Sequence, residues 1–210
     1  MIVIIDYGLG NLGSVKNTLD KLGIDSMISK SKNEIRNSNA IILPGVGSAG
    51  QGMENLKKNN LDIVLVDEIK NGKPFLGICL GMQLLFSKSE EGNTGCLNII
   101  KGSVKKFNSG LKVPQIGWNG IEYQRSNIKN QNDKSKIKNL FNDISDKSSF
   151  YFVNSYYCQP DDESIVAAKT EYGIKYCSVL IKKNIIATQF HPEKSGPTGR
   201  QLITNWLKLI

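Results

Sequence analysis

Histidine and cysteine are scarce in this sequence, and their scarcity limits the chemistry it can perform. Its 210 residues include one histidine and four cysteines, and the cysteines form no C-x-x-C pair. Because this set cannot build a zinc cluster, we expect no metal ion, and we also expect no cofactor. In a reducing compartment Cys96, Cys158 and Cys177 are expected to be structural or incidental.

Long apolar segments and nucleic-acid-binding patterns are also missing. The first apolar run, residues 2–5, ends at Asp6, far short of the ~20 residues of a membrane-spanning helix. The net charge is +8, but the densest basic stretch, residues 129–138, has no aromatic side chain to stack on bases. We expect a cytoplasmic protein with a solvated, lysine-rich surface, which would also suit an acidic protein partner. No nucleic-acid or membrane partner is expected.

The stretch from residue 73 to 86 places a cysteine between a strand and a helix. Residues 75–78 are predicted to form a buried strand, and residues 80–86 have helical character. Gly77 and Gly81 flank Cys79 at two residues on each side, the spacing of a sharp turn that exposes a nucleophile. A helix N-terminus there would favour the thiolate. Free cysteines are also often buried, so the turn alone leaves both interpretations open.

The N-terminal half alternates strands with helices. Strands are predicted at residues 1–5, 24–29, 40–43 and 75–78, and helices at residues 14–22 and 60–70. Such alternation favours a parallel sheet covered on both faces, with a ligand site at the carboxyl ends of its strands. The loop at residues 44–48, P-G-V-G-S, has backbone N–H groups able to form an oxyanion hole, although an ordinary turn would look similar.

The C-terminal half is rich in predicted strands. They are expected at residues 102–107, 120–123, 150–157, 165–169, 178–182 and 185–189, and a last helix is expected at residues 199–209. Residues 125–149 are polar and predict an exposed loop, with at most a short helix at residues 137–141. We find no internal repeat and no second domain boundary.

The only histidine follows the last predicted strand, in the sequence His191-Pro192-Glu193. Because Pro192 disfavours a helix at the preceding residue, His191 and Glu193 can face the same way. A carboxylate beside a histidine fixes its tautomer and stabilises its cation. Together with Cys79, the pair predicts a catalytic triad of nucleophile, base and acid.

Several motifs in the sequence resemble those of the class I, or triad, glutamine amidotransferases. They are P-G-V-G, G-I-C-L-G-M-Q-L-L-F, I-G-W-N, F-Y-F-V-N-S-Y and Q-F-H-P-E-K-S-G. Within that family the chain is most similar to the glutaminase subunits of imidazole glycerol phosphate synthase. The resemblance implies an α/β, single-domain, flavodoxin-like fold over residues 1–210: a central, largely parallel sheet flanked by helices, with antiparallel strands added in the C-terminal half.

The resemblance also implies a role for each matching residue. Cys79 would be the nucleophile that attacks glutamine, His191 the acid and base, and Glu193 the group that orients it. The oxyanion would be held by Val46, Gly47 and Leu80, and bound glutamine would be contacted by Gln83, Glu91, Ser155 and Tyr156. A partner would be contacted by Trp118, Asn119, Tyr151 and Lys194.

The chemistry itself implies a partner protein. Ammonia released into neutral water is mostly protonated and no longer nucleophilic, so it must pass directly to an acceptor site, for which this domain has no room. In the family the partner is a (β/α)8-barrel cyclase, which forms a heterodimer with the glutaminase in histidine biosynthesis. Alternatives are a related subunit that supplies ammonia for surface-sugar amidation, a non-catalytic partner-binding subunit, and a thiol-redox protein.

Two residues depart from the pattern of the family. Asn154 and Gln115 stand where histidine is usual, and the segment at residues 125–149 is long for the family. Neither residue belongs to the predicted triad, but both are expected near the partner-facing side. They leave the identity of the ammonia acceptor open.

Overall fold

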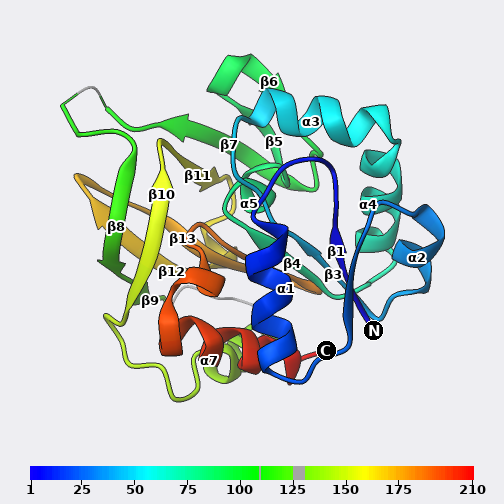
Figure 1. The fold of residues 1–210 in the computed structure, drawn as a ribbon. Coiled ribbons are helices and arrows are strands. Elements are labelled where there is room, and N and C mark those ends of the chain that lie inside the picture. Colours follow the sequence, from blue (N-terminus) through cyan, green and yellow to red (C-terminus); the bar gives the residue numbers. More distant parts are fainter. Residues whose placement is uncertain (109, 125–130) are drawn as a thin grey trace.

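The computed structural model describes residues 1–108, 110–124 and 131–210 (Figure 1). A twelve-stranded sheet runs through this part of the chain. Its first five strands are parallel, in the order β2 (Ser26–Ser29), β1 (Ile2–Ile5), β3 (Ala40–Leu43), β4 (Phe75–Ile78) and β14 (Ile185–Thr188). The carboxyl ends of β4 and β14 therefore lie side by side, immediately before Cys79 and close to His191.

Mainly antiparallel strands extend the sheet beyond β14. They are β13 (Ile174–Lys182), β11 (Tyr156–Pro160), β7 (Ile100–Lys106), β5 (Phe86–Ser89) and β6 (Thr94–Gly95), with β12 (Val166–Tyr172) and β9 (Glu122–Tyr123) branching from β13. Only the pair β5 and β7 is parallel within this extension. A separate antiparallel pair, β8 (Gln115–Gly120) and β10 (Ser149–Asn154), lies at the left of Figure 1.

Helices cover both faces of the parallel strands. One face packs against α2 (Lys32–Asn37), α3 (Ala49–Lys58) and α4 (Leu61–Lys70), and the other against α1 (Leu12–Lys21), α6 (Gln131–Leu140) and α7 (Gly196–Leu207). The single-turn α5 (Leu80–Gln83) and the short 3₁₀ segments η1 (Glu91–Asn93), η2 (Glu163–Ile165) and η3 (Pro192–Lys194) complete the described elements.

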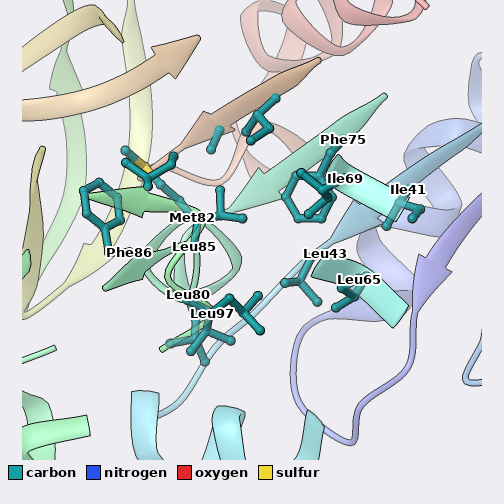
Figure 2. Close-up of a cluster of buried hydrophobic side chains, with 14 of the residues drawn as sticks. Ile41, Leu43, Leu65, Ile69, Phe75, Leu80, Met82, Leu85, Phe86 and Leu97 are labelled. Atoms are coloured by element: carbon teal, nitrogen blue, oxygen red, sulfur yellow. The ribbon is translucent and has the colours of Figure 1, made fainter. Parts of the chain in front are cut away.

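Successive residues of the inner parallel strands enter opposite cores. Val3 and Ile5 belong to the cluster under α3 and α4, whereas Ile2 and Ile4 belong to the cluster under α1 and α7. Figure 2 shows the first cluster, in which side chains from β3, β4 and α4 gather with those that follow Cys79. Both faces are thus buried, which confirms the predicted α/β sheet.

Two predictions around the site were wrong about where elements end. The predicted helix over residues 80–86 ends at Gln83, because the chain after it pairs with residues 97–100 and continues as β5 from Phe86. The predicted strand over residues 150–157 divides at Ser155 into β10 and β11, which belong to different sheets. This break lets residues 153–156 curve around Cys79.

Other elements also differ from the predictions. Neither α2 nor α3 was predicted, and the strand predicted at residues 120–123 is divided between β8 and β9. In the predicted loop, α6 spans ten residues, since Ile137 and Leu140 are buried in the core beside α7. Residues 125–130 of that loop lie outside the described residues. Among the helices the structure describes, none is long and apolar enough to cross a membrane.

Candidate active site

Two glycines make the sharp turn at Cys79 possible. Cys79 has φ 54° and ψ −107°, a region that non-glycine residues seldom occupy. A Cβ at Gly81 would overlap the carbonyl oxygen of Leu43, and one at Gly77 would lie 3.0 Å from the carbonyl oxygen of Gly81. The Cys79 N–H donates a 2.7 Å hydrogen bond to the Thr188 carbonyl oxygen, which ties the turn to β14. The G-x-C-x-G spacing is therefore a steric requirement of this turn.

His191 and Glu193 form a buried pair next to this turn. Nδ1 of His191 lies 2.8 Å from Oε1 of Glu193, and their side chains are 3% and 2% exposed. Ser195 holds the segment in place: its hydroxyl donates a 2.6 Å hydrogen bond to the His191 carbonyl oxygen and accepts one of 2.9 Å from the Tyr151 N–H. Because Nδ1 is engaged by Glu193, Nε2 is the ring nitrogen available to Cys79.

Opposing effects act on the charge of His191. Burial disfavours the imidazolium and lowers its pKa, but the charge and hydrogen bonding of Cys79, followed by those of Glu193, outweigh burial and raise the pKa of His191 to about 10. The cation is therefore the favoured form at neutral pH. Such a pairing of sulfur and imidazolium is the arrangement that activates cysteine nucleophiles.

A pocket of about 200 Å³ opens beside Cys79. Its wall includes all seven residues predicted to hold the oxyanion or glutamine, which are Val46, Gly47, Leu80, Gln83, Glu91, Ser155 and Tyr156, together with Pro114, Val153 and Asn154. Hollows of about 320 and 500 Å³ lie elsewhere, against α6, but no cysteine or histidine is among the described residues that line them. Of these three cavities, the smaller pocket beside Cys79 is the one lined by a cysteine.

Two of the predicted glutamine contacts also hold the pocket together. The Glu91 carboxylate accepts a 2.7 Å hydrogen bond from the Ala49 N–H at the start of α3. The Gln83 side chain donates to the Tyr156 carbonyl oxygen at 3.2 Å. Loss of either side chain would therefore disturb the pocket wall as well as any ligand in it.

Tyr7 supports the predicted oxyanion loop and was missed by the sequence analysis. Its buried hydroxyl donates a 2.9 Å hydrogen bond to the Pro44 carbonyl oxygen, and a Cβ at Gly45 would lie 2.5 Å from that hydroxyl. Burial raises the pKa of Tyr7, so the hydroxyl stays protonated and can donate. No local signal in the sequence connects residue 7 with residue 44.

The four predicted partner contacts lie outside the pocket. Trp118 on β8 is 59% exposed and meets Tyr151 on β10 edge to face, with ring centroids 6.1 Å apart. Ile116, which the sequence analysis missed, is 64% exposed on the same strand. Lys194 is exposed. The Asn119 side chain donates a 2.9 Å hydrogen bond to the Glu171 carbonyl oxygen, so it also stabilises the fold.

In the described residues, no group of three or more histidine, cysteine, aspartate or glutamate side chains is placed to hold a metal ion.

Comparisons with known proteins point to one family. The profile of the family described as "Glutamine amidotransferase class-I" matches residues 3–209. The "Imidazole glycerol phosphate synthase subunit HisH" of Dehalococcoides mccartyi strain 195 is 44% identical over 210 residues, covering 100% of this chain and 97% of its own. The protein of the same name from Chlorobaculum tepidum is 43% identical over 209 residues, covering 98% of each.

Solved structures show the same fold at low sequence identity. A crystal structure described as a glutamine amidotransferase superposes with a TM-score of 0.75 at 16% identity, covering 100% of this chain and 98% of its own. PurLQS from Thermotoga maritima gives a TM-score of 0.76 at 16% identity, covering 99% and 97%. These likenesses concern the fold alone.

Proposed function

The chain belongs to the class I glutamine amidotransferase family, and from that premise we propose that it is the glutaminase subunit of an imidazole glycerol phosphate synthase, acting in histidine biosynthesis. The observation that carries the proposal is the meeting of Cys79, His191 and Glu193 beside a small pocket, in a chain 43–44% identical to subunits of that enzyme. Residues 1–210 would act as one glutamine amidotransferase domain.

The first half of the proposed reaction transfers a glutamyl group to sulfur. In the resting pair the proton of Cys79 already lies on Nε2 of His191, and the thiolate attacks the carboxamide carbon of glutamine. The electron pair of the C=O bond moves to oxygen, and the N–H groups of Leu80 and of the Val46-Gly47 loop would hold the resulting oxyanion. His191 then protonates the leaving nitrogen, so ammonia departs and a thioester remains.

The second half returns the enzyme to its starting state. His191 removes a proton from water, the hydroxide attacks the thioester carbonyl, and glutamate leaves as the sulfur takes back its bonding pair. Glu193 keeps Nδ1 occupied in both halves, so Nε2 always faces the reacting atoms. Gln83, Glu91, Ser155 and Tyr156 are proposed to bind glutamine, supported by their positions in the pocket wall.

The partner is proposed to be a (β/α)8-barrel cyclase subunit that receives the ammonia. The exposed side chains of Trp118, Ile116 and Lys194, with Tyr151 beside Trp118, are the surface proposed to meet it. Large exposed aromatic and apolar side chains are enriched at protein interfaces. The cytoplasmic location expected from the sequence stays a prediction.

Two measurements test this function. The chain, co-expressed with a histidine-pathway cyclase in a strain that lacks its own glutaminase subunit, should restore growth without histidine. The purified pair should convert glutamine to glutamate only while Cys79 is intact. Glutaminase activity without growth would favour an ammonia acceptor of another kind, such as a surface sugar, whereas no glutaminase activity would contradict the proposed chemistry itself.

A further inference from the structure

Gln189, which has no role in the reaction described above, touches the sulfur of Cys79. It directly follows β14, is fully buried, and its amide nitrogen lies 3.6 Å from Cys79 Sγ. Its amide oxygen accepts a 3.1 Å hydrogen bond from Nε2 of Gln83. We propose that Gln189 is a further catalytic residue, whose amide N–H stabilises the thiolate of Cys79 before it attacks glutamine.

The orientation of the Gln189 amide follows from its neighbours. Nε2 of Gln83 also donates to the Tyr156 carbonyl oxygen, so it is the nitrogen of the Gln83 amide that faces Gln189. Gln189 must therefore turn its oxygen toward Gln83 and its nitrogen toward Cys79. An N–H group directed at sulfur is a weak donor to a thiol but a strong one to a thiolate, because the acceptor is then charged.

Burial makes this donor valuable. Cys79 is 6% exposed, so few water molecules can solvate a charge on its sulfur. His191 attracts that charge while it is protonated, and the Gln189 amide adds a second donor at the same sulfur. Gln189 keeps its N–H group throughout. It therefore lowers the free energy of the thiolate without taking part in proton transfer.

This role predicts a specific dependence on pH. Without the N–H group the thiolate loses a donor, so the sulfur should react more slowly at neutral pH, whereas high pH favours the thiolate in either protein. A variant that lacks the donor should therefore react slowly at pH 7 and approach the wild-type rate as the pH rises. A residue that only supports the fold would slow the reaction at every pH.

The experiment measures alkylation of Cys79 by iodoacetamide in the full-length chain between pH 5.5 and 9.5, with the Cys79 peptide quantified by mass spectrometry. Gln189→Leu should slow alkylation at pH 7 by about tenfold and move the midpoint of the profile upward. Gln189→Met, unbranched and of similar length, removes the same donor with less change in packing and should behave alike. Circular dichroism establishes that each variant is folded.

Ser178→Ala is the matched control. Ser178 is fully buried, its carbonyl oxygen accepts a 2.9 Å hydrogen bond from the Gln189 N–H, and its hydroxyl has no hydrogen-bond partner. The substitution changes a buried polar side chain at the same place but leaves the Gln189 amide in position. Its alkylation profile should superpose on that of the wild type.

The inference rests on the proposed role of Cys79, and the two can fail separately. If a glutamine-mimicking electrophile does not label Cys79 in the wild-type chain even when the cyclase partner is present, the proposed function fails. If Cys79 is labelled but the folded Gln189 variants give the wild-type profile, or are slow at every pH, the role of Gln189 is refuted.

Discussion

The hydroxyl of Tyr176 donates a 2.9 Å hydrogen bond to Oε1 of Gln115 in the protein interior. Asn154 lies opposite Gln115 in the register of β8 and β10, and its side chain also interacts with this hydroxyl. Burial raises the pKa of Tyr176, so it stays protonated and can donate. Gln115 and Asn154, the two departures from the family pattern, are thus joined through one tyrosine. They form a single polar cluster that links β8, β10 and β13 beside the pocket.

Tyr176→Phe should destabilise this cluster. It leaves the amides of Gln115 and Asn154 without their shared partner in a buried site, which costs about 1–3 kcal/mol. Urea denaturation of the two proteins measures the difference in the free energy of unfolding. Tyr157→Phe, in the same aromatic group but partly exposed, is the control and should cost less. An equal cost for both would mean that the cluster contributes nothing specific.

Cys79→Ala should abolish glutamine hydrolysis and leave ammonia-dependent synthesis by the complex intact. The reason is that the thioester cannot form, whereas the acceptor site belongs to the partner. Activity of the complex is measured with glutamine and, separately, with an ammonium salt at alkaline pH. Glutamine turnover in this variant would require a different nucleophile.

The charge of His191 should depend on Cys79. Burial lowers its pKa, and Cys79 is the largest influence that raises it to about 10, so Cys79→Ala should lower the pKa of His191. Because the chain has one histidine, a single set of imidazole resonances in an NMR titration reports it. An unchanged titration would show that the sulfur does not interact with the ring.

The same shift affects stability. A pKa of His191 raised from 6.5 to about 10 stabilises the fold fully below pH 6.5, and the contribution is lost as the pH rises through about 10. In Cys79→Ala the contribution should be smaller and its loss should be complete at lower pH, which unfolding curves recorded across that range can detect.

His191 and Glu193 should differ in importance. His191→Asn removes the proton carrier and should approach the effect of Cys79→Ala. Glu193→Gln keeps a group that can accept a hydrogen bond from Nδ1, so kcat should fall less than in His191→Asn. In another catalytic triad the two losses of kcat differ by roughly two orders of magnitude. Steady-state glutamine hydrolysis in the presence of the partner compares them. The roles are misassigned if Glu193→Gln is the more damaged of the two.

The sequence predicts those parts of the site that local rules determine. The glycines around Cys79 and the proline after His191 restrict the backbone at adjacent positions, and the structure shows the turns expected there. The contacts of Gln189 with Cys79 and of Tyr7 with Pro44 join residues 110 and 37 positions apart. No periodicity or motif encodes such pairs, because they exist only once the parallel strands have assembled.

Tertiary pairing also explains the wrong helix prediction. The apolar spacing of residues 80–86 fits a helix, but backbone bonds from Leu97 to Leu84 and from Ile100 to Leu85 turn the segment toward β5 after a single turn. A helix of one turn has a much smaller dipole than the longer helix predicted from the sequence. The donor from Gln189 therefore becomes more important for the thiolate.

The isolated subunit should be a poor glutaminase that its partner activates. The oxyanion loop is held at one end, where Tyr7 bonds the Pro44 carbonyl oxygen and Gly10 packs against Gly45. Its other end is more open, since Val46 is 41% exposed and Gly47 has φ 109°, a conformation that glycine adopts without strain. Rotation of the Val46-Gly47 peptide would turn one oxyanion donor toward or away from Cys79.

One such donor changes the rate by on the order of 10²–10³. Turnover of glutamine should therefore rise by about that factor when the cyclase and an analogue of its substrate are added to the chain. Gly47→Ala restricts the same rotation and should reduce the ratio of activated to basal turnover, while the Gly13→Ala control, where a Cβ meets nothing within 4 Å, should leave it unchanged. Equal turnover of the wild-type chain with and without its partner would refute the switch, because a peptide that rotates without changing the rate cannot serve as the missing oxyanion donor.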